Sequence, residues 1–242
     1  MKKIALIPAR YAATRFPAKL MQLLGDKPVI RNTYNNTVTT GLFDEVVVVT
    51  DSPIIFDEIT NHGGKALMSK SEHQSGSDRI AEALVNMDAD LVVNVQGDEP
   101  FVQKEPLEKL LAMFKEESVK VASLMQQIKE PRFIADPNYV KVVVDKNMNA
   151  LFFSRSPIPY QRDKELMPVY YEHIGVYAFR KQALLDFTNW DISPLEALEK
   201  IECLRYLENG IPIRMVLTEY MGIEIDTEED LIRANHRLTG LR

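Results

Sequence analysis

Short apolar runs separated by polar segments recur through the first half of the chain. Each run is brief and rich in β-branched residues, which predicts buried strands at about 4–7, 45–50, 65–68 and 91–96. Helical spacing between and after these runs predicts helices at about 28–40, 53–61, 76–86 and 104–116. Strands that alternate with helices in this way predict an α/β fold with a doubly wound, mostly parallel sheet flanked by helices.

The second half of the chain is less regular and richer in strands. Apolar runs predict strands at about 119–127, 141–145, 150–153, 174–177, 213–217 and 222–226. Helices are expected at about 181–187 and 195–209, and a terminal helix begins at Thr227. This β-rich middle is either a smaller lobe packed on the main sheet or an extension of it.

The fourth predicted strand ends abruptly at Gln96-Gly97-Asp98-Glu99-Pro100. Open α/β sheets bind their ligands at the carboxyl ends of their strands, and carboxylates there supply the hard oxygen ligands of a Mg²⁺–phosphate site. The alternative is a solvated turn, because Gly, Asp and Pro all favour turns. The residues alone leave both interpretations open.

The loop after the first strand carries three cations, Arg10, Arg15 and Lys19. It lacks the glycines of a dinucleotide fingerprint or a P-loop, which disfavours a dehydrogenase and leaves phosphate binding to long cationic side chains. A basic surface loop is the alternative. The position after the first strand favours anion binding.

A polar turn, His73-Gln74-Ser75-Gly76-Ser77-Asp78-Arg79, leads into the third predicted helix. Its backbone N–H groups and serines could hold a phosphate, a ribose or a base, although capping by Ser75 or Ser77 is the commoner use of such residues. Arg79 falls in the first helical turn, where the helix dipole disfavours a cation. An anionic partner would explain that placement.

Asp226 ends an apolar run just as Asp98 does, so two carboxylates could converge on one metal ion. Spacing alone favours a different role, in which Asp226 or Thr227 caps the terminal helix and Glu229 or Asp230 completes a capping box. Cys203 is most simply a small buried apolar residue on a helix. Single polar residues beside apolar runs, such as Arg155, His173 and Glu202, are more often packed or ion-paired than ligands.

Composition narrows the functional classes. A net charge of −6 gives no general reason to bind nucleic acid or an anionic membrane. One cysteine excludes an intramolecular disulfide framework and fits a reducing compartment. The N-terminus reaches Pro8 too soon for a signal peptide, and no run approaches the roughly 20 apolar residues of a membrane span. We therefore expect a cytoplasmic protein without membrane insertion.

Together these segments resemble the 3-deoxy-manno-octulosonate (Kdo) cytidylyltransferases, or CMP-Kdo synthetases, along almost the whole chain. The similarity is carried by Ile7-Pro8-Ala9-Arg10, Thr14–Pro17 with Lys19, His73–Arg79, Asn94–Pro100, Phe153–Tyr160, His173–Tyr177, Leu195-Glu196, Glu202 with Leu204-Arg205, and Ile225–Asp230. The first loop is shared with many nucleotidyltransferases, whereas the segments around Asp98 and Arg155 are more specific. Ala13, Leu20 and Cys203 stand where the family often has serine, proline and glutamine, and Cys203 bears on how the sugar is recognised.

The resemblance implies a single nucleotidyltransferase-type, Rossmann-like domain over 1–242, with a smaller β-rich lobe for dimerisation and sugar binding. About 1–118 would bind nucleotide, 119–220 would bind sugar and dimerise, and 221–242 would return to the main sheet. It further implies a cytoplasmic homodimer with CTP and Kdo as small-molecule substrates and Mg²⁺ as cofactor, producing CMP-Kdo for lipopolysaccharide synthesis.

The same resemblance assigns roles to individual residues. Arg10, Arg15 and Lys19 would grip the triphosphate, and Asp98 and Asp226 would coordinate Mg²⁺. The nucleotide pocket would be lined by Met68, Ser75, Gly76, Arg79 and Gln96, and the acidic sugar would be held by Arg155, His173, Tyr177 and Glu202. The sugar's anomeric hydroxyl would attack the α-phosphorus, with catalysis by alignment and by charge neutralisation from Mg²⁺ and Lys19. A related enzyme for another 2-keto sugar acid, such as a sialic acid or amino-Kdo, and a non-catalytic sugar-nucleotide-binding regulator remain alternatives.

Overall fold

The computed structural model describes residues 1–12, 16–70, 73, 75–219 and 222–240. Its contacts divide the chain into two units, Met1–Leu107 with Met221–Arg242, and Glu108–Tyr220. We describe each unit separately, and the single-domain organisation stays a prediction. Among the described residues, no helix is long and apolar enough to cross a membrane.

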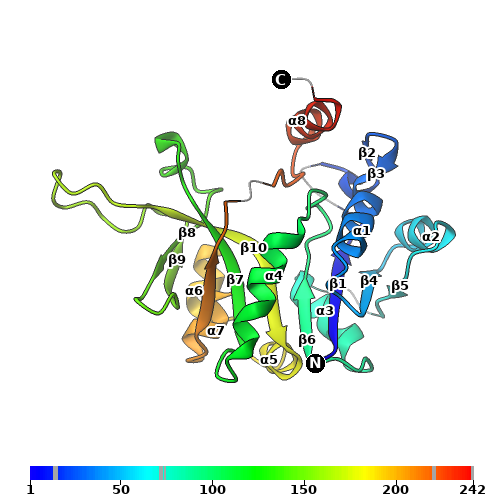
Figure 1. The fold of residues 1–242 in the computed structure, drawn as a ribbon, viewed down its shortest axis with the longest axis horizontal. Helices are drawn as coiled ribbons and strands as arrows, with labels where there is room; N and C mark the ends of the chain where they lie inside the picture. Colours follow the sequence, from blue (N-terminus) through cyan, green and yellow to red (C-terminus); the bar gives the residue numbers. More distant parts are fainter. Residues whose placement is uncertain (13–15, 71–72, 74, 220–221, 241–242) are drawn as a thin grey trace. The chain divides into compact units, whose positions relative to one another are not determined.

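The first unit contains four parallel strands in the order β6, β1, β4, β5 (Figure 1). These are β6 (Leu91–Asn94), β1 (Lys3–Ala9), β4 (Glu45–Thr50) and β5 (Ala66–Met68). Residues 4–7 of β1 are fully buried, as expected for a central parallel strand covered on both faces. The predicted α/β sheet is thereby confirmed, and the carboxyl ends of its strands lie along one edge.

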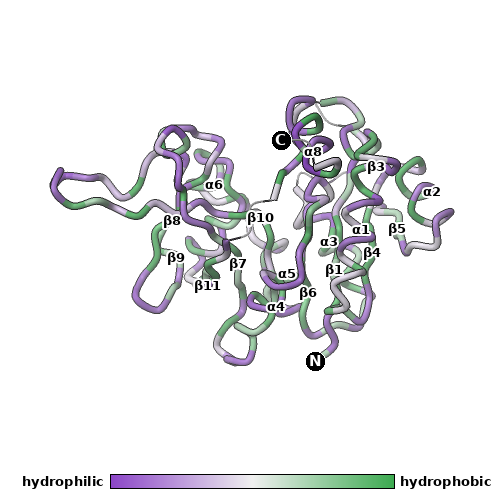
Figure 2. Tube along the Cα trace, turned by 45° about the horizontal axis from the view of Figure 1, so that its top comes forward, coloured by the Kyte–Doolittle hydropathy of each residue, from purple (hydrophilic) through white to green (hydrophobic). Residues whose placement is uncertain are grey.

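Four helices belong wholly to this unit: α1 (Val29–Thr39), α2 (Pro53–Asn61), α3 (Gly76–Leu84) and α8 (Glu228–Thr239). The helix α4 (Lys104–Ala112) crosses the boundary between the units in sequence. The start of α2 is fixed by local chemistry, because Ser52 caps its Ile55 N–H and Pro53 occupies the first helical position. Figure 2 shows apolar positions along β1, β4 and β6, and apolar positions that alternate with polar ones along the helices.

The sequence did not predict a small hairpin of β2 (Leu23–Leu24) and β3 (Lys27–Pro28), which follows the 3-10 helix η1 (Lys19–Met21). Two-residue strands are too short to show a period-2 pattern. Gly25 supplies the positive φ of 66° that the turn between them requires. The 3-10 helix η1 that precedes this hairpin begins with Lys19, one of the predicted phosphate ligands.

The second unit has a mixed, mainly antiparallel sheet. Its strand β7 (Val121–Gln127) pairs parallel with β11 (Ile213–Leu217) and antiparallel with β10 (Tyr171–Arg180). Beyond β10, β8 (Lys141–Val144) and β9 (Ala150–Ser154) add antiparallel strands. The short helices are η2 (Met113–Lys115), η3 (Pro131–Phe133), α5 (Lys181–Phe187), α6 (Pro194–Glu199) and α7 (Leu204–Glu208).

Two predicted elements were wrong. The helix expected at 195–209 is divided into α6 and α7, because Lys200 adopts a left-handed conformation with φ 56°. The break lets the buried Arg205 of α7 bond the carboxylate of Glu196 in α6 at 2.6 and 2.7 Å. The strand expected at 222–226 does not form. The Ile225 N–H instead donates a hydrogen bond to the Asp98 carbonyl at 3.0 Å.

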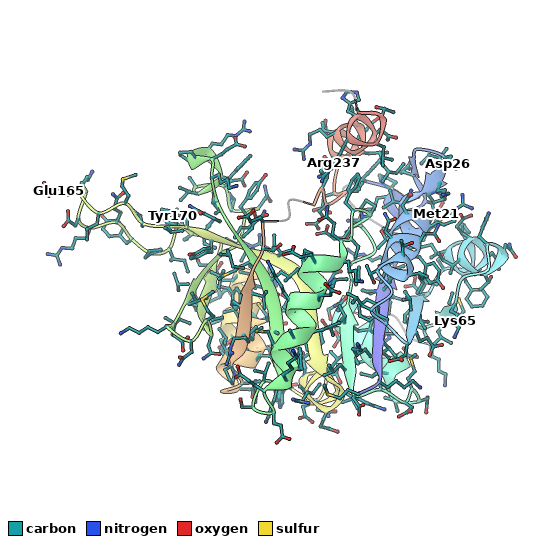
Figure 3. The ribbon with its side chains drawn as sticks, in the orientation of Figure 1. Met21, Asp26, Lys65, Glu165, Tyr170 and Arg237 are labelled. Atoms are coloured by element: carbon teal, nitrogen blue, oxygen red, sulfur yellow. The ribbon has the colours of Figure 1, made fainter. Side chains whose placement is uncertain are left out.

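Between β9 and β10 an arm, residues 155–170, extends away from the sheet of the second unit. Figure 3 labels Glu165 near its tip and Tyr170 at its base. Its apolar side chains are exposed, with Tyr160 at 87% and Met167 at 85%. Such exposure is typical of a surface that contacts a partner.

Candidate functional site

The turn after β6 is locked against the end of β1. A Cβ on Gly97 would lie 2.9 Å from the carbonyl oxygen of Pro8, a backbone atom that cannot move aside, so only glycine fits. Thr33 donates a hydrogen bond to the Gly97 carbonyl at 2.8 Å. These contacts fix where Asp98, the next residue, projects from the strand end.

Asp98 meets two residues that are remote in sequence. Lys19 Nζ lies 2.5 Å from Asp98 Oδ2 and 2.7 Å from Asp226 Oδ1, so one ammonium group bridges both carboxylates. The side chains of Lys19 and Asp98 are only 16% and 15% exposed. The structure therefore brings together the three residues that we predicted to be catalytic.

The local pattern around Asp226 also explains why its carboxylate reaches this place. Thr227, rather than Asp226, caps α8, accepting the Asp230 N–H at 3.2 Å while the Asp230 carboxylate accepts the Thr227 N–H at 2.9 Å. The capping box that the sequence left open is thus formed by Thr227 and Asp230. Asp226 is left to project from the start of the helix toward Lys19.

The electrostatics of this cluster favour a charged lysine. Burial acts to lower the pKa of Lys19, but attraction to Asp98 and Asp226 outweighs it and the pKa is raised above its ordinary value. Lys19 therefore remains an ammonium ion throughout the physiological pH range.

Glu224 adds a third carboxylate that the sequence analysis missed. Ligand atoms of Asp98, Glu224 and Asp226 all lie within 4.8 Å of one another. The pKa of Glu224 is raised well above its usual value by burial and by repulsion from Asp98, Glu99 and Asp226. Its spacing of two residues from Asp226 in an extended segment is the signal that could have revealed it.

This cluster has the chemistry of a divalent cation site. Its donors are hard carboxylate oxygens, the kind that Mg²⁺ prefers. The Oδ1 atom of Asp98 is buried and has no hydrogen-bond partner, so one ligand position is available. An ammonium ion already occupies the space between two of the carboxylates, which shows that the cluster accommodates positive charge.

The other two predicted phosphate ligands are less informative. Arg10 is exposed just beyond β1, whereas Arg15 lies outside the described residues, as does the Ala13 departure. Leu20, the second departure, is buried with its Cδ1 only 3.2 Å from where a Gly97 Cβ would lie. The structure therefore places one cation of the first loop, Lys19, at the carboxylates.

The turn entering α3 combines capping with close packing at the strand ends. Ser75 caps the helix, accepting the Asp78 N–H at 3.1 Å and donating to its carboxylate at 2.9 Å. A Cβ on Gly76 would lie 3.1 Å from Pro8 and 3.7 Å from Gln96 Oε1, so this glycine packs between two strand ends. Met68, at the end of β5, is 43% exposed.

Arg79 has an anionic partner inside the protein. Its guanidinium donates to Asp51 Oδ2 at 2.7 Å and to Ser69 Oγ at 2.6 Å, and the residue is 4% exposed. The expected anion is therefore the carboxylate of Asp51, which the sequence analysis did not select although it follows β4 as Asp98 follows β6. Contact between Arg79 and a nucleotide stays a prediction.

Two of the predicted sugar-binding residues, His173 and Tyr177, lie together on β10. Their ring centroids are 5.2 Å apart, and the His173 ring also meets Phe153 at 4.9 Å. Burial lowers the pKa of His173 to about 3, so its imidazole is neutral at physiological pH, and its Nε2 lies 3.0 Å from Ser123 Oγ.

Cys203 and Glu202 face this aromatic pair. Cys203 is 1% exposed, as predicted, and hydrogen-bonds with Tyr177. Burial raises the pKa of the Cys203 thiol to about 12 and raises that of Tyr177 well above its usual value, and the negative charge of Glu202 adds to both shifts. The thiol thus occupies, beside Tyr177, the position where the family usually has glutamine.

Arg155, the fourth predicted sugar-binding residue, is held by backbone oxygens at the end of β9. Its guanidinium donates to the carbonyls of Pro137 at 2.8 Å, Glu199 at 2.7 Å and Lys200 at 3.3 Å. This arrangement was not predictable from the sequence, because the acceptors are main-chain atoms of distant segments.

Comparison with solved structures places this fold and site in a class. A structure described as CMP:2-keto-3-deoxy-manno-octonic acid synthetase complexed with CTP has a TM-score of 0.95 and 36% identity over 99% of both chains. A 4-diphosphocytidyl-2C-methyl-D-erythritol synthase from Anaerococcus prevotii shares the fold, with a TM-score of 0.66 and 20% identity over 98% of this chain and 99% of that one. The sequence model of the cytidylyltransferases matches residues 4–217. The protein is thus a nucleotidyltransferase of the cytidylyltransferase class.

Full-length relatives define the family more narrowly. The 3-deoxy-manno-octulosonate cytidylyltransferase of Flavobacterium johnsoniae is 60% identical over 98% of this chain and 99% of its own length. That of Christiangramia forsetii is 55% identical over 98% of this chain and 96% of its own. The chain belongs to the 3-deoxy-manno-octulosonate cytidylyltransferase family of enzymes.

Proposed function

We propose that this enzyme transfers CMP from CTP to the anomeric hydroxyl of Kdo in a Mg²⁺-dependent reaction, releasing pyrophosphate and supplying CMP-Kdo for lipopolysaccharide synthesis. The observation that carries the proposal is the convergence of Lys19, Asp98 and Asp226 at the edge of the sheet. The relatives named above and the CTP complex of a similar protein support the choice of substrates.

Asp98 and Asp226 would hold Mg²⁺, with Glu224 close enough to contribute. The bound metal would supply positive charge to the triphosphate as negative charge develops on its oxygens. Lys19, Arg10 and Arg15 would grip the same triphosphate, with Lys19 released from one or both carboxylates when the metal takes its place.

Met68, Ser75, Gly76, Arg79 and Gln96 would line the nucleotide pocket, and Arg155, His173, Tyr177 and Glu202 would hold the sugar acid. In the reaction, the anomeric oxygen forms a bond to the α-phosphorus while the bond from that phosphorus to the pyrophosphate oxygen breaks. We assign no protein residue as a general base, so the hydroxyl proton passes to solvent. Alignment and charge neutralisation by the protein would account for most of the rate.

One assay tests this function directly: pyrophosphate release measured with CTP, Mg²⁺ and a panel of 2-keto sugar acids, beside matched reactions with UTP. Release with CTP and Kdo alone supports the proposal. Release with a sialic acid or an amino-Kdo in preference to Kdo would reassign the sugar. No release with any acid, together with retained binding of a CMP-sugar, would indicate a regulator.

We further propose that the protein is a homodimer and that the arm, residues 155–170, contacts the second copy. Four exposed apolar side chains support this: Tyr160 at 87%, Leu166 at 68%, Met167 at 85% and Val169 at 47%. The double variant Leu166→Glu/Met167→Glu should shift the mass measured by light scattering from dimer to monomer. A monomeric wild-type protein at micromolar concentration would contradict the proposal.

A further inference from the structure

The end of α6 is hydrogen-bonded to the residues where the arm begins. Glu199, the last residue of α6, accepts hydrogen bonds through both carboxylate oxygens, from Ser154 Oγ at 2.7 Å and from the Arg155 backbone N–H at 2.9 Å. Its carbonyl oxygen accepts a third, from Arg155 Nε at 2.7 Å. Glu199 therefore fixes both the main chain and the side chain of Arg155.

The left-handed turn at Lys200 completes this support. Because the chain reverses direction there, the carbonyl of Lys200 also accepts a bond from the Arg155 guanidinium, at 3.3 Å. A left-handed conformation is unfavourable for a non-glycine residue. Bonds from a cationic donor to the last carbonyls of the helix offset that cost, since those carbonyls have no partner within the helix.

The guanidinium of Arg155 is fixed in place by only some of its N–H donors. Of the five N–H donors of an arginine, the structure commits three to the carbonyls of Pro137, Glu199 and Lys200. One N–H on each terminal nitrogen remains, and among the described residues no carboxylate is bonded to the guanidinium. Guanidinium N–H groups form charge-assisted hydrogen bonds with carboxylate oxygens.

Glu199 also limits repulsion between two neighbouring cations. Lys141 is fully buried and donates to the Asp136 carbonyl at 2.9 Å. Its compensating charges are Asp136 first, then Glu172 and Glu199. Burial lowers the pKa of Lys141, and the positive charge of Arg155 adds to the effect. Glu199 is therefore one of three negative charges, with Asp136 and Glu172, that offset the repulsion between Arg155 and Lys141.

We propose that Glu199 is a positioning residue, which orients Arg155 so that its two remaining donors receive the carboxylate of the sugar-acid substrate. This inference rests on the proposed function, because it assumes that Arg155 binds the acidic sugar. Glu199 itself touches no substrate in this scheme and acts through Arg155.

The test uses full-length Glu199→Gln, which keeps the shape of the side chain but replaces one acceptor oxygen with a donor. We expect the KM for the sugar acid to rise by about 10- to 100-fold, since a misplacement of about 1 Å can cost 10²-fold, while the KM for CTP stays within twofold. Glu208→Gln is the matched control, because Glu208 accepts only from the Leu195 N–H on the neighbouring helix. An equal rise in both KM values, or the same effect in the control, would overturn the inference.

A second comparison isolates the substrate carboxylate. Wild-type enzyme should prefer the sugar acid to its methyl ester, and Glu199→Gln should reduce that preference by about the factor by which it raises the KM. When Arg155 is already replaced by Ala, adding Glu199→Gln should raise the KM for the sugar acid by less than about twofold. The reason is that the effects of residues that act together are not additive. Independent, multiplicative losses would contradict a role through Arg155.

Measurements of folding distinguish an unfolded variant from one that binds the sugar acid poorly. Circular dichroism and the Tm show whether each variant is folded. Where Glu199→Gln is unstable, Ser154→Ala replaces it; this variant removes one donor to Glu199 and also the acceptor of the Ser156 N–H. Its expected effect is a rise of about threefold in the KM for the sugar acid. A Ser154→Ala KM equal to that of the wild type would then overturn the inference. If the wild-type enzyme is active and Glu199→Gln has the same KM for the sugar acid, the inference alone is overturned. If the wild-type enzyme uses no sugar acid, both the proposed function and the inference are overturned.

Discussion

The predicted phosphate and sugar sites, one in each unit, use polar groups in different ways. In the first unit, charged side chains meet other charges at strand ends, as in the bridge from Lys19 to Asp98 and Asp226 and in the pair of Arg79 with Asp51. In the second, the predicted sugar site centres on His173, whose burial favours the uncharged form, and on Tyr177 and Cys203, which burial keeps protonated.

This difference follows the chemistry that each region would perform. A triphosphate and a divalent cation need fixed charges of both signs, which stabilise developing charge without reorganisation. A hydroxylated sugar is recognised by neutral hydrogen-bonding groups, with Arg155 reserved for its single carboxylate. The comparison predicts that charge removal is costly for turnover in the first unit, whereas neutral groups of the second should shape stability and pH dependence.

The largest effect is expected from Asp98→Asn and Asp226→Asn. Each should raise the barrier by about 4 kcal/mol while changing CTP affinity little, because the carboxylates act on charge that develops in the transition state. Steady-state kinetics and calorimetric titration of Mg²⁺ check the two parts, with the exposed Asp88→Asn as control. Unchanged turnover would remove the residue from the metal site.

Lys19→Ala should cost about 2.7 kcal/mol of barrier, the lower end of the range for a preorganised charge stabiliser. The loss should not be recovered by higher Mg²⁺ concentration if Lys19 acts on the phosphate rather than only on the carboxylates. Measuring kcat across a Mg²⁺ series distinguishes these roles. A loss below tenfold would mean that the salt bridges of Lys19 are structural only.

Asp51→Asn tests whether paired charges in the first unit also stabilise it. Arg79 would keep its position but lose a charged acceptor, so the free energy of unfolding should fall by about 1–3 kcal/mol. Glu45→Gln, which breaks the exposed pair with Lys65, should change it by about 0–1 kcal/mol. Urea unfolding followed by circular dichroism measures both, and equal effects would show that burial of Arg79 is unimportant.

The pH dependence of stability probes His173. Its pKa is about 3 in the folded protein and about 6.5 when unfolded, so the unfolded state binds more protons between these values. Stability from this group is therefore full above pH 6.5 and is lost as pH falls toward 3, by up to about 1.4 kcal/mol per pH unit. His173→Asn should remove this component of the slope, and an unchanged slope would show that the ring is not buried in the neutral form.

The smallest effect concerns Cys203. A pKa of about 12 leaves almost no thiolate at pH 8, so alkylation by iodoacetamide should be negligible in the folded protein and should appear on unfolding in urea. Mass spectrometry of the alkylated protein measures this. Rapid reaction of the native protein would mean that the site beside Tyr177 is open to solvent.

Much of the fold was predictable from local patterns. The bounds of β4, α2, α5 and β11 agree with those predicted, because each has a clear apolar pattern, and in α2 Ser52 and Pro53 also mark the start of the helix. The division of the helix predicted at 195–209 was not predictable, since the buried bond between Glu196 and Arg205 requires a break that helical spacing does not show.

The candidate site likewise divides into features that the sequence predicted and features that it did not. The sequence by itself determined that Asp98 and Asp226 each follow an apolar run and that Lys19 follows the first strand. This pattern left a capping role for Asp226 ahead, and it was the resemblance to the cytidylyltransferases that predicted a shared metal site. Only the tertiary structure decided which atoms meet: that Lys19 bridges the two carboxylates, that Glu224 joins them, and that Asp51 and Glu199 hold Arg79 and Arg155. Local propensity sets the period and ends of an element, but partners between distant segments depend on how those elements pack, and main-chain acceptors leave no mark on side-chain pattern.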